Sequence, residues 1–309
     1  MKTRAHDPAE LLALAESVLR RVGDHEPPPL KSVPKGDLRV GVDLGTAYLV
    51  LLVLDESGVP LAGEYQFAQV VRDGLVVDFV GAVHRLGEMK ARVERRLGRQ
   101  LTHAASAFPP GVPRAEVWAT ANVVEAAGMH CRDLIDEPSA ANALLSLHSG
   151  AIVDVGGGTT GIAILQDGEV VYTADEATGG THFSLVIAGA HDISFENAEA
   201  MKLDHNEQQR LLPVVRPVME KVASIAARHI AIYESGSGKS VDQLTLVGGT
   251  ASFPGIGEVV QEYTGIPTQV PERPLFVTPL GIALHDTASD TKRSDEEAKQ
   301  FPAPIANME

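Results

Sequence analysis

Apolar runs separated by short turn signals open the main body of the chain. Residues 38–74, LRVGVDLGTAYLVLLVLDESGVPLAGEYQFAQVVRDG, are broken at 45–46, at 57–58 and at 73–74 by pairs that contain glycine. Aliphatic and β-branched runs between such pairs are typical of antiparallel hairpins. The pattern therefore predicts a meander of strands.

Helical spacing replaces this pattern after residue 79. We predict a helix at 80–98, a short apolar strand at 104–108 and a helix at about 114–127. CRDLIDE then predicts a strand, and PSAANALLSLH predicts a helix whose proline stands in the first turn, where no amide hydrogen is needed. Strands that alternate with helices in this way indicate an α/β fold.

The second half of the chain repeats the opening of the first. AIVDVGGGTTGIAILQDG aligns with VGVDLGTAYLVLLVLDESG, which matches Asp43 with Asp154 and Gly45 with Gly156 or Gly157. Helices at 181–190 and across 192–233, the strand QLTLVGG, a Gly/Pro loop and another helix follow. A repeat of this kind predicts two related subdomains, each opening with the same hairpin.

The two ends of the chain have a different character. Apolar residues at helical spacing predict a short amphipathic helix at 8–22, followed by a Pro-rich linker. This helix is either a partner-binding segment or a helix packed on its own domain. We divide the chain into an N-terminal segment (1–36), a first subdomain (37–150), a second subdomain (151–286) and a charged, disordered tail (287–309).

Charge and composition narrow the class of protein. The formal net charge is −15, which disfavours nucleic-acid binding because phosphate neutralisation needs clustered Lys and Arg. A single cysteine excludes a disulfide scaffold and a multi-cysteine metal site. No apolar run approaches the ~18–20 residues of a membrane span. We expect a cytoplasmic protein that binds neither membrane nor nucleic acid.

The chemistry is concentrated in the two repeated turns. In each, a strand ends in Asp (Asp43 or Asp154) and runs directly into glycines and threonine. Glycine lets the backbone approach a bulky anion, and successive N–H groups in such a turn form an anion nest. The carboxylate at the strand end can hold Mg²⁺ through its waters. Two such turns predict that one metal–polyphosphate unit is bound between them, with one turn on each side.

Two further segments agree with this interpretation. In LTLVGGTASFPGI a buried strand runs into Gly248 and Gly249, where the backbone can lie against a flat nucleobase. In IDEPSAANALL, Glu137 stands at a strand end before a helix of small residues and could orient a water molecule.

VGVDLGT, DEPSAANA, DVGGGTTGIAI and LVGGTASFPG resemble, in this order, the first phosphate, first connecting, second phosphate and adenosine motifs of the actin-like ATPases. That superfamily includes DnaK-type chaperones, bacterial actins, FtsA and PilM, and the resemblance covers about residues 38–286. Within it, VVRDGLVVDF, IDEPSAANALL and LVGGTASFPGI are most similar to the EutJ family, chaperone-like proteins of ethanolamine utilization associated with bacterial microcompartments.

The resemblance implies an actin-like α/β fold, with two duplicated subdomains that each hold a twisted mixed sheet flanked by helices, and with ATP and Mg²⁺ in the cleft between them. It also implies a set of site residues: Gly45, Thr46 and Ala47 on one side of the phosphates, Gly156, Gly157, Gly158 and Thr159 on the other, Gly248, Gly249 and Thr250 at the adenosine, Glu220 and Lys221 at the nucleoside, Asp43 and Asp154 at Mg²⁺ through water, and Glu137 with Asp154 in catalysis. The chain has no evident counterpart of the chaperones' catalytic lysine, and Ala47 replaces a threonine common in the superfamily.

The function that the resemblance implies is a chaperone-like assembly factor with weak ATPase activity. Its client would be an ethanolamine-utilization enzyme or a microcompartment component, and it could self-associate as a homo-oligomer. Two alternatives stay open at this point. One is a nucleotide-binding scaffold of the actin, FtsA or PilM kind with little hydrolysis, and the other is a small-molecule kinase of the same fold.

Overall fold

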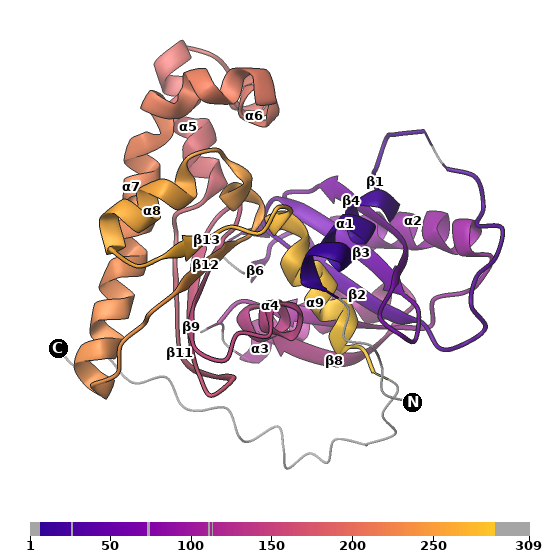
Figure 1. The fold of residues 1–309 in the computed structure, drawn as a ribbon. Helices are drawn as coiled ribbons and strands as arrows, with labels where there is room; N and C mark the ends of the chain where they lie inside the picture. Colours follow the sequence, from indigo (N-terminus) through magenta and orange to yellow (C-terminus); the bar gives the residue numbers. More distant parts are fainter. Residues whose placement is uncertain (1–6, 26, 73–74, 111, 113, 288–309) are drawn as a thin grey trace.

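The computed structural model describes residues 7–25, 27–72, 75–110, 112 and 114–287. Of the predicted tail (287–309), all but residue 287 lies outside the described residues. The chain forms two mixed β-sheets side by side, with helices against them and two helices between (Figure 1).

The first sheet has the strand order β1-β4-β3-β2-β7-β8. Its strands are β1 (Leu19–Arg21), β2 (Arg39–Leu44), β3 (Tyr48–Leu54), β4 (Pro60–Phe67), β7 (His103–Phe108) and β8 (His130–Asp136). The predicted meander β2-β3-β4 is antiparallel, and β7 and β8 join it in parallel register. A small separate hairpin, β5 (Val71–Arg72) and β6 (Leu75–Val76), follows the meander.

The second sheet repeats five of these strands in the same arrangement. Its order is β11-β10-β9-β12-β13, with β9 (Gly150–Val155), β10 (Thr160–Gln166), β11 (Glu169–Glu176), β12 (Leu244–Val247) and β13 (Thr268–Gln269). β9, β10 and β11 are antiparallel neighbours, and β12 and β13 are parallel to β9. The internal repeat seen in the sequence is therefore a repeat of topology.

Helices shield the faces of the two sheets. The first sheet carries α2 (Phe79–Leu97) and α3 (Arg114–Ala126), and the second half contains α5 (Gly180–His191), α6 (Phe195–Leu203), α7 (His205–Ser237) and α8 (Ile256–Thr264). α7 is the long helix along the outer side of the second sheet in Figure 1. It continues through two internal prolines, Pro213 and Pro217.

The chain crosses between the halves on two helices that pack against each other, α4 (Glu137–Leu145) and α9 (Val277–His285). Their contact is very close, because a Cβ atom added to Gly281 would lie 1.8 Å from the carbonyl oxygen of Ala140. α9 also lies on β2, where a Cβ on Gly41 would stand 2.6 Å from the amide nitrogen of Ala283. A buried cluster that includes Leu144, Ile152 and Leu280 fills the space between the sheets. The two halves thus meet through one shared core.

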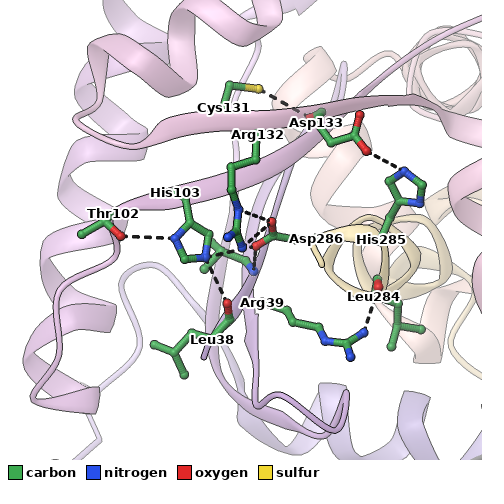
Figure 2. A network of polar contacts seen from close by, with 11 residues as sticks. Leu38, Arg39, Thr102, His103, Cys131, Arg132, Asp133, Leu284, His285 and Asp286 are labelled. Carbon is green, nitrogen blue, oxygen red and sulfur yellow. Dashed lines mark hydrogen bonds and ion pairs between the residues drawn. The ribbon is translucent and has the colours of Figure 1, made fainter. Parts of the chain in front are cut away.

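The end of α9 is fastened to the first sheet by one buried carboxylate, that of Asp286 (Figure 2). The residue is 1% exposed, and its side chain accepts hydrogen bonds from the Val40 amide at 2.7 Å and from Nε of Arg132 at 2.9 Å. Nε2 of His103 lies 3.5 Å from Oδ2 of the same carboxylate. Arg39 adds a bond to the Leu284 carbonyl at 3.1 Å. Residues from β2, β7 and β8 therefore hold the final described helix in place.

The N-terminal helix, α1 (Pro8–Val18), is shorter than the predicted helix at 8–22, because residues 19–21 pair with β4 as the strand β1. It packs on its own domain. Its apolar residues Leu11, Leu12 and Ala15 are at most 5% exposed and belong to the shared core. The second of the two alternatives for this helix is therefore the one observed. No helix in the described part of the chain is long and apolar enough to cross a membrane.

Candidate functional site

A cavity of about 1190 Å³ lies between the two halves. Ligand sites of nucleotide or drug size occupy roughly 300–1,000 Å³, so the cavity has room for a nucleotide. Of the site residues predicted from the sequence, those that line it are Asp43, Gly45, Thr46, Ala47, Glu137, Asp154, Gly156, Gly157, Gly158, Thr159, Gly248, Gly249 and Thr250. The fold thus brings all four motifs to one place.

The two repeated turns have the same hydrogen bond at the same position. In the first turn, the amide of Gly45 donates to the carbonyl of Tyr48 at 3.0 Å. In the second turn, the amide of Gly156 donates to the carbonyl of Thr159, also at 3.0 Å. The structural repeat therefore pairs Gly45 with Gly156 and not with Gly157.

The tips of the two turns touch across the cavity. A Cβ on Gly157 would lie 2.5 Å from Cβ of Ala47, and a Cβ on Gly158 would lie 2.9 Å from Cγ2 of Thr46. This approach explains the small residue at 47, because a threonine there would crowd Gly157. Within the described part of the chain, the amides of these four tip residues donate no hydrogen bond to protein. Free, converging N–H groups of this kind are what an anion nest requires.

Three carboxyl groups, those of Asp43, Glu137 and Asp154, form the floor of the cavity. Burial and the nearby Asp154 raise the pKa of Asp43 to about 7. Burial raises the pKa of Asp154 to about 6, which Asp175 also favours and a hydrogen bond from Thr278 opposes. Burial, followed by repulsion from Asp154 and Asp43, raises the pKa of Glu137 well above its ordinary value. Neighbouring acidic groups with raised pKa values in a cavity are typical of a functional site.

Two neighbours fix the Asp154 carboxylate. The Thr278 hydroxyl donates to its Oδ2 at 3.1 Å, and a Cβ on Gly248 would lie 2.2 Å from its Oδ1. Gly248 also has φ +89°, a conformation that side chains rarely adopt. Position 248 therefore needs glycine, because any side chain there would collide with the Asp154 carboxylate. Thr250 is likewise engaged within the protein, because its hydroxyl donates to the Gly156 carbonyl at 2.8 Å.

Glu220 and Lys221 do not line the cavity. Both lie on the exposed side of α7, where Glu220 accepts a hydrogen bond from Arg216 at 2.9 Å. The cavity is lined instead by Glu199 and Lys202 of α6, whose charged groups pair at 2.7 Å. The sequence pattern predicts helices across 192–233 but does not show where one ends and the next begins; the structure has this break at Asp204, between α6 and α7.

Four cationic side chains, Arg21, Arg72, Lys202 and Arg273, line the cavity among the described residues. Lys202 pairs with Glu199, while Arg273 forms ion pairs with acidic neighbours. Arg21 and Arg72 have no ion pair within the described residues. The sequence analysis did not identify either arginine as a site residue, although Arg72 lies within the motif VVRDG.

Comparison with known proteins decides the family. The ethanolamine utilization protein EutJ of Escherichia coli K12 is 45% identical over 248 residues, which are 80% of this chain and 85% of that protein. The crystal structure of EutJ from Carboxydothermus hydrogenoformans is 44% identical, has a TM-score of 0.81 and matches over 90% of this chain and 97% of that one. The chain belongs to the EutJ family.

More distant likenesses place the EutJ family among actin-like folds. The structure of MreB 5 of Spiroplasma citri bound to AMPPNP is 18% identical, with a TM-score of 0.64 over 80% of this chain and 95% of that one. A profile of the MreB/Mbl protein family matches residues 61–203, and one of the type IV pilus assembly protein PilM matches residues 145–278. The fold is thus that of the actin-like ATPase superfamily predicted from the four motifs.

Proposed function

We propose that the protein is an ATP-binding, chaperone-like assembly factor of the ethanolamine-utilization system, and that it acts in the cytoplasm, where it associates with a microcompartment. Closure of the two halves on ATP and Mg²⁺ would be read by a protein client, either an enzyme of the system or a microcompartment component. The observation that carries the proposal is the pair of glycine turns whose tips touch in the cavity, whose tip amides have no acceptor among the described residues, and which share that cavity with three partly buried carboxyl groups.

The residues of the cavity floor fit Mg²⁺ held through water. The described residues contain no group of three or more His, Cys, Asp or Glu side chains arranged to hold a metal ion directly. Mg²⁺ keeps several waters and takes few carboxylates, and carboxylates with raised pKa values gain most from a nearby cation. When bound, Mg²⁺ would neutralise charge on the phosphates. Asp43 and Asp154 would orient its waters, and Glu137 would hold the attacking water in line with the terminal phosphate.

A thermal-shift titration with ATP, ADP and GTP, each with and without Mg²⁺, tests the proposal. Binding to the folded state adds RT ln(1+[L]/Kd), about 2.7 kcal/mol at a hundred-fold excess of ligand over Kd. We expect a Mg²⁺-dependent rise in melting temperature with ATP. The absence of a shift with every nucleotide would refute nucleotide binding and leave a scaffold function.

Arg72 is expected to supply positive charge to the phosphates, in the absence of an evident chaperone-type lysine. The segment that carries it begins beside the first turn, where the amide of Ala68 donates to the carbonyl of Ala47 at 2.9 Å. We predict that Arg72→Gln weakens ATP·Mg binding about ten-fold, as expected for the loss of one charge-assisted contact, and weakens ADP·Mg binding less. Isothermal titration calorimetry measures both, with Arg85→Gln, an exposed residue of α2 outside the cavity, as the control. Equal affinities in the two variants would contradict this role.

A further inference from the structure

The N-terminal segment formed by α1 and β1 is an addition to the duplicated fold. Each sheet contains the same five-stranded arrangement, and within the described residues β1 has no counterpart in the second sheet. β1 pairs in parallel with β4, the outer strand of the five-stranded arrangement, with Leu19 opposite Gly63 and Arg21 opposite Tyr65. The pairing is tight, because a Cβ on Gly63 would lie 2.7 Å from Cδ2 of Leu19. This added strand forms part of the wall of the cavity.

The segment also connects the two halves. α1 packs on β4 and α9 and on the short helical turn η2 (Pro274–Phe276), which follows β13 of the second sheet. Glu16, on the exposed side of α1, forms an ion pair with Arg273 next to that turn, and both residues line the cavity. The ion pair therefore joins the added segment to the second half at the edge of the cavity.

The two arginines of β1 point in opposite directions, as successive residues of a strand do. Arg20 lies away from the large cavity, and its Nη1 donates to the carbonyls of Ser17 and Leu19 at 2.8 Å. Arg21 is exposed and lines the cavity, and its guanidinium forms no hydrogen bond or ion pair within the described residues.

Two tyrosines that line the cavity lie near Arg21. Their rings, those of Tyr48 and Tyr65, have centroids 6.0 Å apart. Arg21 is the register partner of Tyr65 across β1 and β4, which puts the two residues side by side. Burial raises the pKa of both phenols; Glu199 adds to the rise for Tyr48, Asp24 and Glu16 add to it for Tyr65, and the positive charge of Arg21 opposes both. Tyr48 follows the first phosphate turn directly, so this corner, with one guanidinium and two phenols, adjoins the turn.

We propose that the α1–β1 segment is a working part of the nucleotide site: Arg21 contacts the anionic portion of a bound nucleoside di- or triphosphate, and the Glu16–Arg273 ion pair closes the edge of the cavity over it. The inference rests on the proposed nucleotide binding and adds a residue and an element outside the duplicated core. Coupling free energies are reciprocal, so a nucleotide that contacts Arg21 also holds the segment more firmly on β4.

Arg21→Gln tests the contact, and Arg20→Gln on the same strand is the matched control. We expect calorimetry with ADP·Mg and ATP·Mg to show a loss of about ten-fold for Arg21→Gln and none for Arg20→Gln, since a charge-assisted hydrogen bond contributes about 1.4 kcal/mol or more. Hydrogen exchange at residues 8–21 should slow when nucleotide binds the unmodified protein, and should slow less in Arg21→Gln.

Glu16→Gln tests the closure, with Glu10→Gln on the same helix as its control. Glu10 is exposed and has no ion pair in the described structure. Loss of one exposed ion pair should speed the release of a fluorescent ADP analogue about three-fold in Glu16→Gln and leave release unchanged in Glu10→Gln.

The outcomes separate this inference from the proposed function. Nucleotide binding that is the same in the unmodified protein and in Arg21→Gln and Glu16→Gln would overturn this inference and leave the proposed function standing. If the unmodified protein binds no nucleotide, both are overturned.

Discussion

Asp154→Ala should abolish the Mg²⁺ dependence of nucleotide binding while leaving the fold intact. Asp154 lines the cavity with Asp43 and Glu137, and its carboxylate is oriented by Thr278 and Gly248. A carboxylate that orients metal-bound waters commonly accounts for about 10–100-fold in metal affinity. We expect ATP affinity in the presence of Mg²⁺ to fall by about 100-fold and to match the affinity measured without Mg²⁺.

The same variant should be more stable than the unmodified protein when no ligand is bound. Removing Asp154 removes the repulsion that helps to raise the pKa of Asp43 to about 7. The sign of the pH dependence follows from these values. The folded protein holds protons on Asp43 and Asp154 that the unfolded chain, with ordinary pKa values near 3.8, has released. These groups therefore stabilise the ligand-free fold most below about pH 4, and that stability is lost as the pH rises through 6 and 7.

Melting temperatures at pH 5 and pH 8, without ligand, measure this effect. The melting temperature should fall less between pH 5 and pH 8 in Asp154→Ala than in the unmodified protein. The control Asp242→Ala, a change at an exposed residue outside the cavity, should behave as the unmodified protein does. A variant that still binds ATP with undiminished Mg²⁺ dependence would show that the metal is held elsewhere.

Gly281→Ala is expected to destabilise the fold by about 3 kcal/mol, the upper range for overpacking a core. The added methyl group would lie 1.8 Å from the Ala140 carbonyl oxygen, and a helix backbone has little freedom to move away. α4 and α9 would have to separate, which disturbs the only two described crossings between the sheets.

Chemical denaturation compares Gly281→Ala with Gly87→Ala. Gly87 lies in α2 with no atom within 4 Å of an added Cβ, so alanine there should stabilise the helix by about 0.5–1 kcal/mol. Opposite shifts of the unfolding midpoint are expected. A Gly281→Ala midpoint equal to that of the unmodified protein would mean that the helix contact is looser than described.

The parts of this molecule that local sequence determines were predictable. Each glycine turn is specified by residues that are neighbours in the chain, and its duplication made the pairing of Asp43 with Asp154 visible without a structure. Helices and strands of the core were predicted to within a few residues, as for α2 at 79–97 against the predicted 80–98.

Contacts between residues distant in the chain were not predictable in this way. No local pattern shows that β1 pairs with β4, or that Arg21 of that strand lines the cavity. The nucleoside side depends on where a long helical region bends, and periodicity alone does not distinguish Glu199 and Lys202 on α6 from Glu220 and Lys221 on α7. The close contact of Gly248 with the Asp154 carboxylate joins the end of β12 to β9, which are far apart in the sequence of the second half.

The return of α9 to the first sheet sets an order of events during synthesis. Strands β2 and β3 leave the ribosome long before the helix that covers them, which ends at His285 and is secured by Asp286. Domains usually fold as units while the chain emerges from its N-terminus. Here the apolar face of the first sheet stays uncovered until the chain has been translated as far as α9. A nascent protein of this kind would itself need protection from aggregation, and it should release from stalled ribosomes in a native state only when residue 286 has cleared the exit tunnel.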